Sequence, residues 1–269
     1  MERARLSLNQ ITIERCNLEQ AVAACSRHGI PHIGVWRHKL DGLKIEDARR
    51  LIGGAGLRVS SVCRGGMFPA PAKAERQRRI DDNLRAIDEA SELGAEVLVL
   101  VCGPAADRDI AAARKMVDDG IAAIAPHARA CGVRLGIEPL HPMFAADRSV
   151  ITSLAEANAL AAKFDAAVVG VVIDVFHVWW DFRVYEEIQR SAGRIFGFHV
   201  SDWQVPLPDV LLGRAMIGDG VIELRELRQA VDEAGYRGPI EVEIFNQSIW
   251  DSDPNQVLAT MCKRFEEVV

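Results

Sequence analysis

Short apolar segments alternate with longer amphipathic segments along the whole chain. The clearest apolar segment is Val97–Val101, which contains only valine and leucine. Parallel strands that are covered by helices on both faces have such nearly continuous apolar sequences, and their alternation with helical segments indicates repeated strand–helix units. The pattern predicts eight strands, at residues 6–13, 32–36, 58–63, 97–101, 134–138, 169–174, 195–199 and 240–244.

Helix boundaries recur between these segments. Asn17 with Gln20 and Ser153 with Glu156 have the spacing of capping boxes, and Asp253 followed by Pro254 is typical of a helix start. Glycines stand just before several of the predicted strands, where a left-handed residue ends a helix at low steric cost; they are Gly29, Gly94, Gly132 and Gly235. The same order of elements is therefore expected eight times.

The chain contains no Pro/Ser-rich linker or compositional break that would divide it. We therefore expect residues 1–269 to form one domain of the α/β class, a single (β/α)8 TIM barrel. In such barrels the catalytic groups project from the C-terminal ends of the strands and from the loops that follow them.

Charge and composition exclude several classes of function. The formal net charge is −6 and the basic residues are scattered, which disfavours a nucleic-acid partner. The six cysteines form no CxxC pair, which indicates reduced thiols in a cytosolic protein. No signal-like or membrane-spanning segment is visible, so we expect a cytoplasmic protein without a membrane partner.

Four of the predicted strands end in a side chain that can bind a metal. Their sequences are GIEP at Glu138, VVID at Asp174, FGFH at His199 and EVEI at Glu243. Three carboxylates that converge after apolar residues need a compensating positive charge, and oxygen ligands with one imidazole suit a divalent cation. The alternative is that each residue is separately a structural polar group at a strand end.

These motifs resemble the xylose-isomerase-like barrel superfamily, in particular its sugar isomerase and epimerase branch. The resemblance covers essentially the whole chain and implies that Glu138, Asp174, His199 and Glu243 are the metal ligands, with Glu138 and Glu243 also catalytic. It further implies two substrate contacts. They are His177, in a D-x-x-H motif, and Arg214, which precedes GDG.

Other polar and aromatic residues follow predicted strand ends. Trp36, His38 and His141 would face the same mouth, and we expect them to bind substrate by hydrogen bonding and stacking. Relatives often carry a glutamate shortly after the first ligand, whereas this chain has His141 in that region. The roles of other residues near strand ends stay open between substrate contact and packing; they are Cys63, Arg64, Trp179 and Trp180.

The resemblance implies an isomerase or epimerase that removes an α-proton from a keto-sugar or related polyol ketone through a metal-stabilised enediolate. The first alternative is a lyase with the same site, acting by β-elimination from a 3-keto-glycoside or by inosose dehydration. An abasic-DNA endonuclease and a non-catalytic sugar-binding barrel are less favoured, since the chain is acidic and all four ligands are present.

The cofactor expected from the ligand types is one Mn²⁺, with Mg²⁺, Co²⁺ or Zn²⁺ as alternatives. The substrate expected is a small carbohydrate without a phosphate group, because no convincing glycine-rich phosphate-binding loop is present. A homo-oligomer is expected by resemblance.

Overall fold

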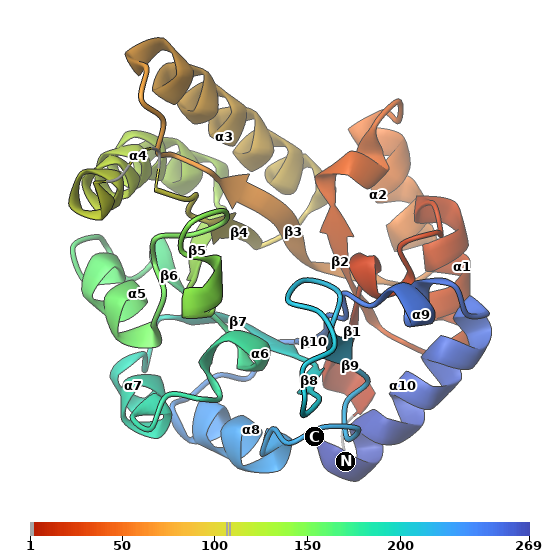
Figure 1. Cartoon of the computed structure of the whole chain (residues 1–269). Helices are drawn as coiled ribbons and strands as arrows, with labels where there is room; N and C mark the ends of the chain where they lie inside the picture. Colours follow the sequence, from red (N-terminus) through yellow and green to blue (C-terminus); the bar gives the residue numbers. More distant parts are fainter. Residues whose placement is uncertain (1–2, 106, 108) are drawn as a thin grey trace.

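Parallel strands close into a barrel in the computed structural model, which describes residues 3–105, 107 and 109–269. The order around the barrel is β1-β10-β7-β6-β5-β4-β3-β2, and the helices form a ring outside it (Figure 1). The predicted α/β class and (β/α)8 TIM-barrel architecture are confirmed. The barrel strands are β1 Leu6–Asn9, β2 His32–Trp36, β3 Arg58–Gly66, β4 Val97–Val101, β5 Arg134–Glu138, β6 Val169–Asp174, β7 Ile195–Val200 and β10 Ile240–Val242.

Most of the helices lie between successive strands, and α9 and α10 follow the last one. They are α1 Leu18–His28, α2 Ile45–Gly54, α3 Lys73–Leu93, α4 Ile110–Cys131, α5 Leu154–Ala161, α6 Val175–Val178, α7 Val184–Arg190, α8 Leu224–Glu233, α9 Gln247–Trp250 and α10 Pro254–Val268. The short 3-10 helix η1 Arg3–Arg5 precedes β1, and three others follow strands: η2 Gln10–Ile13, η3 Arg37–Leu40 and η4 Pro142–Phe144. A small antiparallel pair, β8 Asp202–Trp203 and β9 Arg214–Ala215, lies outside the barrel sheet.

Most of the predicted helix caps are confirmed. Asn17 and Gln20 form a reciprocal capping box at α1, and Asp253 accepts hydrogen bonds from two backbone N–H groups at the start of α10. Ser153 caps α5, but the Glu156 side chain bonds the neighbouring Thr152 instead of closing the box. The predicted C-terminal glycines have positive φ angles that suit a left-handed cap.

Two predicted strands are too long. β1 stops at Asn9 because the Asn9 side chain accepts a hydrogen bond from the N–H of Ile11, and the chain then turns into η2. β10 stops at Val242, since the N–H of Ile244 donates to the Thr12 hydroxyl and not to a neighbouring strand. Residues 10–13 and 243–244 therefore belong to the mouth of the barrel.

A small apolar cluster fills the inside of the barrel. It consists of Cys63, Val97, Val99, Val172 and Phe196. The much larger core lies between the strands and the surrounding helices. Because the interior is packed, a substrate can enter only the mouth at the C-terminal ends of the strands.

Candidate metal centre and pocket

The four predicted ligands meet at the C-terminal mouth of the barrel. Glu138 ends β5, Asp174 ends β6, His199 lies in β7 next to Asp174 in register, and Glu243 follows β10 directly. One nitrogen or carboxylate oxygen from each lies within 4.8 Å of those from the others, and all four side chains are buried. Parallel strand ends thus bring together residues that are more than 100 positions apart at the extremes.

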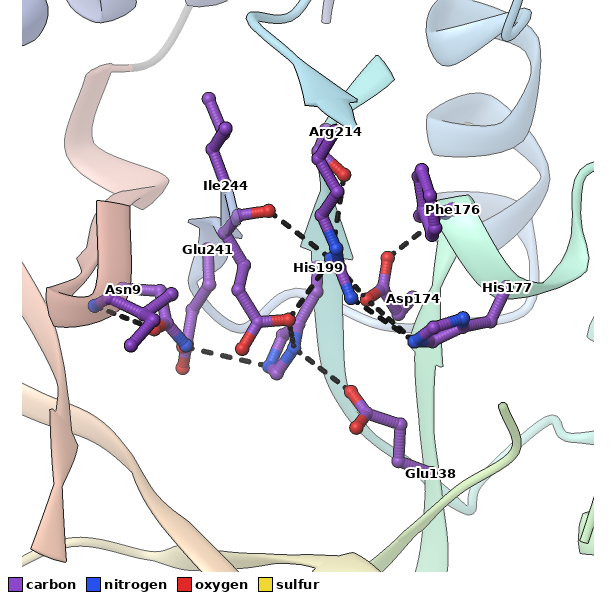
Figure 2. Close-up of polar contacts among 12 residues, drawn as sticks. Asn9, Glu138, Asp174, Phe176, His177, His199, Arg214, Glu241 and Ile244 are labelled. Atoms are coloured by element: carbon purple, nitrogen blue, oxygen red, sulfur yellow. Dashed lines mark hydrogen bonds and ion pairs between the residues drawn. The ribbon is translucent and has the colours of Figure 1, made fainter. Parts of the chain in front are cut away.

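Buried polar atoms in this cluster lack hydrogen-bond partners among the described residues. They are Oε1 of Glu138 and both ring nitrogens of His199. His199 Nδ1 lies 3.3 Å from Glu138 Oε1 and 3.6 Å from Glu243 Oε2, as the dashed lines in Figure 2 indicate for Glu138. Unpaired buried polar groups cost about 1–3 kcal/mol each. A divalent cation bound by these atoms would remove that cost, so the donor set fits a metal.

The charges in the cluster also favour a bound cation. Burial raises the pKa of Asp174 to about 7 and also raises the pKa of Glu138. Burial alone would raise the pKa of Glu243 as well, but Arg214 and His199 lower it to about 2. Three carboxylates in one buried site cannot all be ionised without additional positive charge. One Arg214 side chain does not neutralise all three.

Arg214 and His177 lie beside the cluster. Arg214 Nη1 donates to Asp174 Oδ2 at 2.7 Å and to Glu243 Oε2 at 3.2 Å, and its Nη2 donates to His177 Nε2 at 3.1 Å (Figure 2). Burial and the positive charge of Arg214 lower the pKa of His177 well below its usual value. Since arginine cannot accept a proton, neutral His177 carries its hydrogen on Nδ1, which has no partner among the described residues.

The β8–β9 pair holds Arg214 over the mouth. Asp202 accepts hydrogen bonds from the N–H groups of Gly218, Gly220 and Ile222, which fixes the turn that follows β9. A Cβ at Gly220 would lie 2.4 Å from the Asp202 carboxylate, so this position requires glycine. The glycine-rich turn after Arg214 therefore serves to position the arginine.

A fourth acid, Glu241, lies deeper in the barrel and was missed by the sequence analysis. Its Oε2 accepts a hydrogen bond from Asn9 at 3.0 Å and lies 3.6 Å from His199 Nε2 (Figure 2). Glu241 and Glu243 are two residues apart and so face the same side of the chain. This spacing in the sequence could have indicated that Glu241 lies near the ligand Glu243.

A pocket that is open to solvent lies over the cluster. Among the predicted site residues, Glu138, Glu243, Trp36, His177 and Arg214 line it. So do Cys63 and Arg64, whose roles were open. Further lining residues were not anticipated: Val99, Val101, Leu140, Phe144, Arg148, Phe176, Leu211 and Phe245.

Two predicted substrate contacts lie elsewhere. His38, in η3, is placed 3.4 Å from the Glu14 carboxylate, and its side chain is about half exposed. His141 accepts a hydrogen bond from the N–H of Met143 and packs against Trp180 and Trp203. Neither histidine lines the pocket. Their substrate contacts stay predictions.

A second group of possible metal ligands lies on the surface between α3 and α4. It consists of Asp88, His127 and Cys131. His127 Nε2 and Asp88 Oδ1 are 2.7 Å apart and satisfy each other. This group has no need of a cation, in contrast to the buried cluster.

Among the described residues, none of the helices combines the length and the apolar character that crossing a bilayer would need.

Comparison with known proteins agrees with this architecture. A family model described as "Xylose isomerase-like TIM barrel" matches residues 17–267. The crystal structure of protein SMc04130 from Sinorhizobium meliloti 1021 is 44% identical, covers 99% of both chains and superimposes with a TM-score of 0.96.

Two relatives with named activities are more distant. A 3-dehydroshikimate dehydratase of Pseudomonas aeruginosa is 30% identical over 207 residues, which are 74% of this chain and 31% of that protein. The chain thus spans about a third of the length of this relative. An L-ribulose-5-phosphate 3-epimerase, UlaE, of Escherichia coli O1:K1 / APEC is 25% identical over 205 residues, which are 73% of this chain and 68% of that protein.

Proposed function

The chain belongs to the xylose isomerase-like TIM-barrel family, and from this premise we propose that it is a metal-dependent enzyme that removes the α-proton of a small hydroxylated ketone. The observation that carries the proposal is the buried cluster of Glu138, Asp174, His199 and Glu243, whose unpaired atoms and excess negative charge fit a divalent cation. Mn²⁺ is the proposed ion. When bound, it would polarise the substrate carbonyl and so make the neighbouring C–H bond more acidic.

The chain's own residues supply the proton transfers. Glu138, at the end of β5, and Glu243, directly after β10, both lie close to His199 and both border the pocket. One of them is the proposed base for the α-proton. His177 would donate from Nδ1 to a substrate oxygen, because its Nε2 accepts from Arg214. Trp36, Phe176 and the other apolar lining residues would exclude water from the reacting carbon.

The outcome we place first is elimination of water from a β-hydroxy ketone. In this step the base takes the α-proton, the C–O bond to the β-hydroxyl breaks, and the protonated base passes its proton to the departing hydroxyl, which leaves as water while neutral His177 hydrogen-bonds the oxygen through Nδ1–H. Two features support elimination. The pocket wall is largely apolar and offers few partners for the many hydroxyls of an open-chain sugar, and a relative at 30% identity is named a dehydratase.

Isomerisation or epimerisation, the outcome expected from the sequence, is the second candidate. The presence of two glutamates at the same cluster favours it, since the second could return the proton to another face or carbon. The similarity to a 3-epimerase also supports this outcome. Elimination and epimerisation share the first step and differ in where the proton and the hydroxyl go.

The test combines metal analysis with proton exchange in D₂O. We expect about one bound metal ion per chain, and deuterium uptake beside the carbonyl of at least one compound in a panel of 3-dehydroshikimate, ketoses, 3-keto-glycosides and inososes. Glu243→Gln removes a ligand and a proposed base, so exchange should fall at least about 100-fold. An enone product would identify the lyase, and an epimer or isomer the alternative.

The matched control is Glu92→Gln, an exposed glutamate on α3 whose side chain makes no contact with the pocket. It should keep the metal and the exchange rate of the natural chain. Absence of both metal and exchange in the natural chain would disprove the proposed function.

A further inference from the structure

Two arginines from different parts of the chain line the pocket beside the metal-ligand cluster. Arg64 lies near the end of β3, and Arg148 lies in the loop that follows η4. Resting on the proposed function, we propose that Arg64 and Arg148 bind an anionic group of the substrate, so that the enzyme acts on a ketone that carries a carboxylate or a phosphate.

Neither guanidinium has a protein partner among the residues that the structure describes. Within the described part of the chain, the side chains of Arg64, Arg148 and Arg58 make no hydrogen bond or ion pair, whereas every other described arginine makes at least one. Arg58 is exposed to solvent, where water replaces a partner. Arg64 and Arg148 are half-buried instead. Phe144, whose ring centre lies 5.7 Å from Cζ of Arg148, supplies only a cation–π contact.

Two half-buried arginines without partners destabilise the protein when no ligand is bound. Burial lowers the pKa of Arg64, and the nearby positive charge of Arg148 lowers it further. Two like charges on one partly buried pocket repel each other, and a charge taken from water needs a partner. An anion between them would remove both penalties. Guanidinium groups suit this task because they offer several donors in a planar array that matches carboxylate and phosphate oxygens.

Among the described residues, the pocket offers these two arginines no carboxylate that is free of other contacts. The acidic side chains that line it are Glu138 and Glu243, and both belong to the metal-ligand cluster. The third arginine of the pocket, Arg214, is already held by Asp174, Glu243 and His177. The pocket therefore has two functions divided between two groups of residues: the carboxylate cluster takes the ketone end of the substrate, and the arginine pair takes an anionic end.

The two possible anions have different consequences for the substrate class. A carboxylate gives a hydroxylated keto acid, which agrees with the expectation of a substrate without phosphate. A phosphate gives a ketose phosphate and would make that expectation wrong. The arginine pair needs no glycine-rich loop, because side-chain donors replace the backbone N–H groups of such a loop.

The experiment measures binding to the metal-loaded protein by titration calorimetry with two matched pairs of probes. One pair is 3-dehydroshikimate and its uncharged methyl ester, and the other is L-ribulose 5-phosphate and L-ribulose. We expect the natural chain to bind the anionic member of one pair about 10–100-fold more tightly than the neutral member. The pair that shows this preference distinguishes carboxylate from phosphate.

Three variants locate the preference. Arg64→Gln and Arg148→Gln should each weaken binding of the preferred anion about 10–100-fold and leave the neutral member unchanged. Arg58→Gln removes the exposed unpaired arginine and should change neither. Melting temperatures check the fold: Arg64→Gln and Arg148→Gln should melt no lower than the natural chain, because each removes an unpaired, half-buried charge.

Equal affinity for charged and neutral probes, failure of both anions to bind, or equal losses for both members of a pair in the arginine variants would overturn the inference. These results are separable from the proposed function. Exchange or turnover of neutral ketones alone would keep the function and reject the arginine pair. Anion binding that depends on the two arginines, without any proton exchange, would keep the arginine pair and reject the proposed function.

Discussion

The two ring nitrogens of His199 have different neighbours. Nδ1 lies near Glu138 and Glu243, while Nε2 lies near Glu241, which Asn9 holds by a hydrogen bond. Burial alone would lower the pKa of His199, but Glu241 and the two ligand glutamates raise it well above its usual value. When a histidine binds a metal through one ring nitrogen, a carboxylate that contacts the other nitrogen fixes the orientation of the ring and its tautomer. We therefore assign Glu241 a positioning role.

His32, at the opposite end of the barrel, makes stability depend on pH. It is buried, and burial together with Arg58 lowers its pKa below the usual value. The unfolded chain takes up a proton near pH 6.5, whereas the folded chain resists protonation, so stability should decline as pH falls from about 6.5. His32→Gln should reduce this slope by up to about 1.4 kcal/mol per pH unit. Urea unfolding between pH 5 and pH 7.5 measures it.

His38→Gln is the control for His32, since the His38 side chain is about half exposed. This variant should keep the slope of the natural chain. A His32→Gln slope identical to that of the natural chain would rule out this role. Part of the slope should remain in either variant, because burial also lowers the pKa values of His141 and His177.

At the scale of elements, a glycine on β2 leaves the space inside the barrel that a glutamate on β10 occupies. Gly34 of β2 leaves room for Glu241 of β10: a Cβ at this glycine would lie 2.3 Å from Glu241 Oε2. A larger residue on β2 would force the carboxylate away from His199. The metal-ligand cluster therefore depends on a strand that contributes no ligand.

Gly34→Ala tests this dependence. The displaced Glu241 should no longer hold His199, so the affinity for Mn²⁺ should fall about 10–100-fold. Glu241→Gln should have a similar effect. Both changes act through one carboxylate, so their effects should not add. The double variant should have nearly the same affinity for Mn²⁺ as the single variant that binds it less tightly. Titration with Mn²⁺ gives the dissociation constants.

Gly53→Ala, on the exposed side of α2, is the matched control, since a Cβ at this position meets nothing within 4 Å. It should leave metal affinity unchanged. Unchanged affinity in Gly34→Ala as well would show that the space left by Gly34 is not needed for the cluster.

At the scale of the whole molecule, the cluster joins residues up to 105 positions apart in the sequence, Glu138 and Glu243. A cation held by β5, β6, β7 and the residue after β10 would link these strands only in the folded state. Binding to the folded state alone stabilises a protein by mass action. The other whole-molecule expectations, one domain over residues 1–269, a homo-oligomer and a cytoplasmic location, stay predictions.

Metal removal should therefore lower the melting temperature. At a Mn²⁺ concentration about 100 times the dissociation constant, linkage gives about 2.7 kcal/mol. For a protein of this size this corresponds to roughly 5–10 °C. Scanning calorimetry with Mn²⁺ or with EDTA measures the difference, which Glu243→Gln should abolish and Glu92→Gln should keep. Equal melting temperatures for the natural chain in both conditions would count against metal binding.

Local sequence determined the repeating elements and the positions of the four candidate metal ligands. Apolar runs, caps and C-terminal glycines follow from backbone hydrogen bonding and side-chain burial over a few residues, so most strands were predicted within one or two positions. The metal-ligand cluster followed as well, because parallel strands in a closed barrel must bring their C-terminal ends together. The errors at β1 and β10 arose where side chains, Asn9 and Thr12, took over backbone hydrogen bonds.

Only the tertiary structure decided how deep each polar side chain lies in the barrel and whether it faces the pocket. Glu241 and Glu243 have the same local pattern, and only the closed barrel places one beneath His199 and the other at the pocket. His38 and Arg148 both lie in or after short 3-10 helices, yet Arg148 lines the pocket and His38 pairs with Glu14. The path of such segments depends on packing against distant elements, which local sequence does not encode. Whether a charged side chain finds a protein partner is likewise a property of the assembled pocket, and for this reason the unpaired state of Arg64 became visible only in the structure.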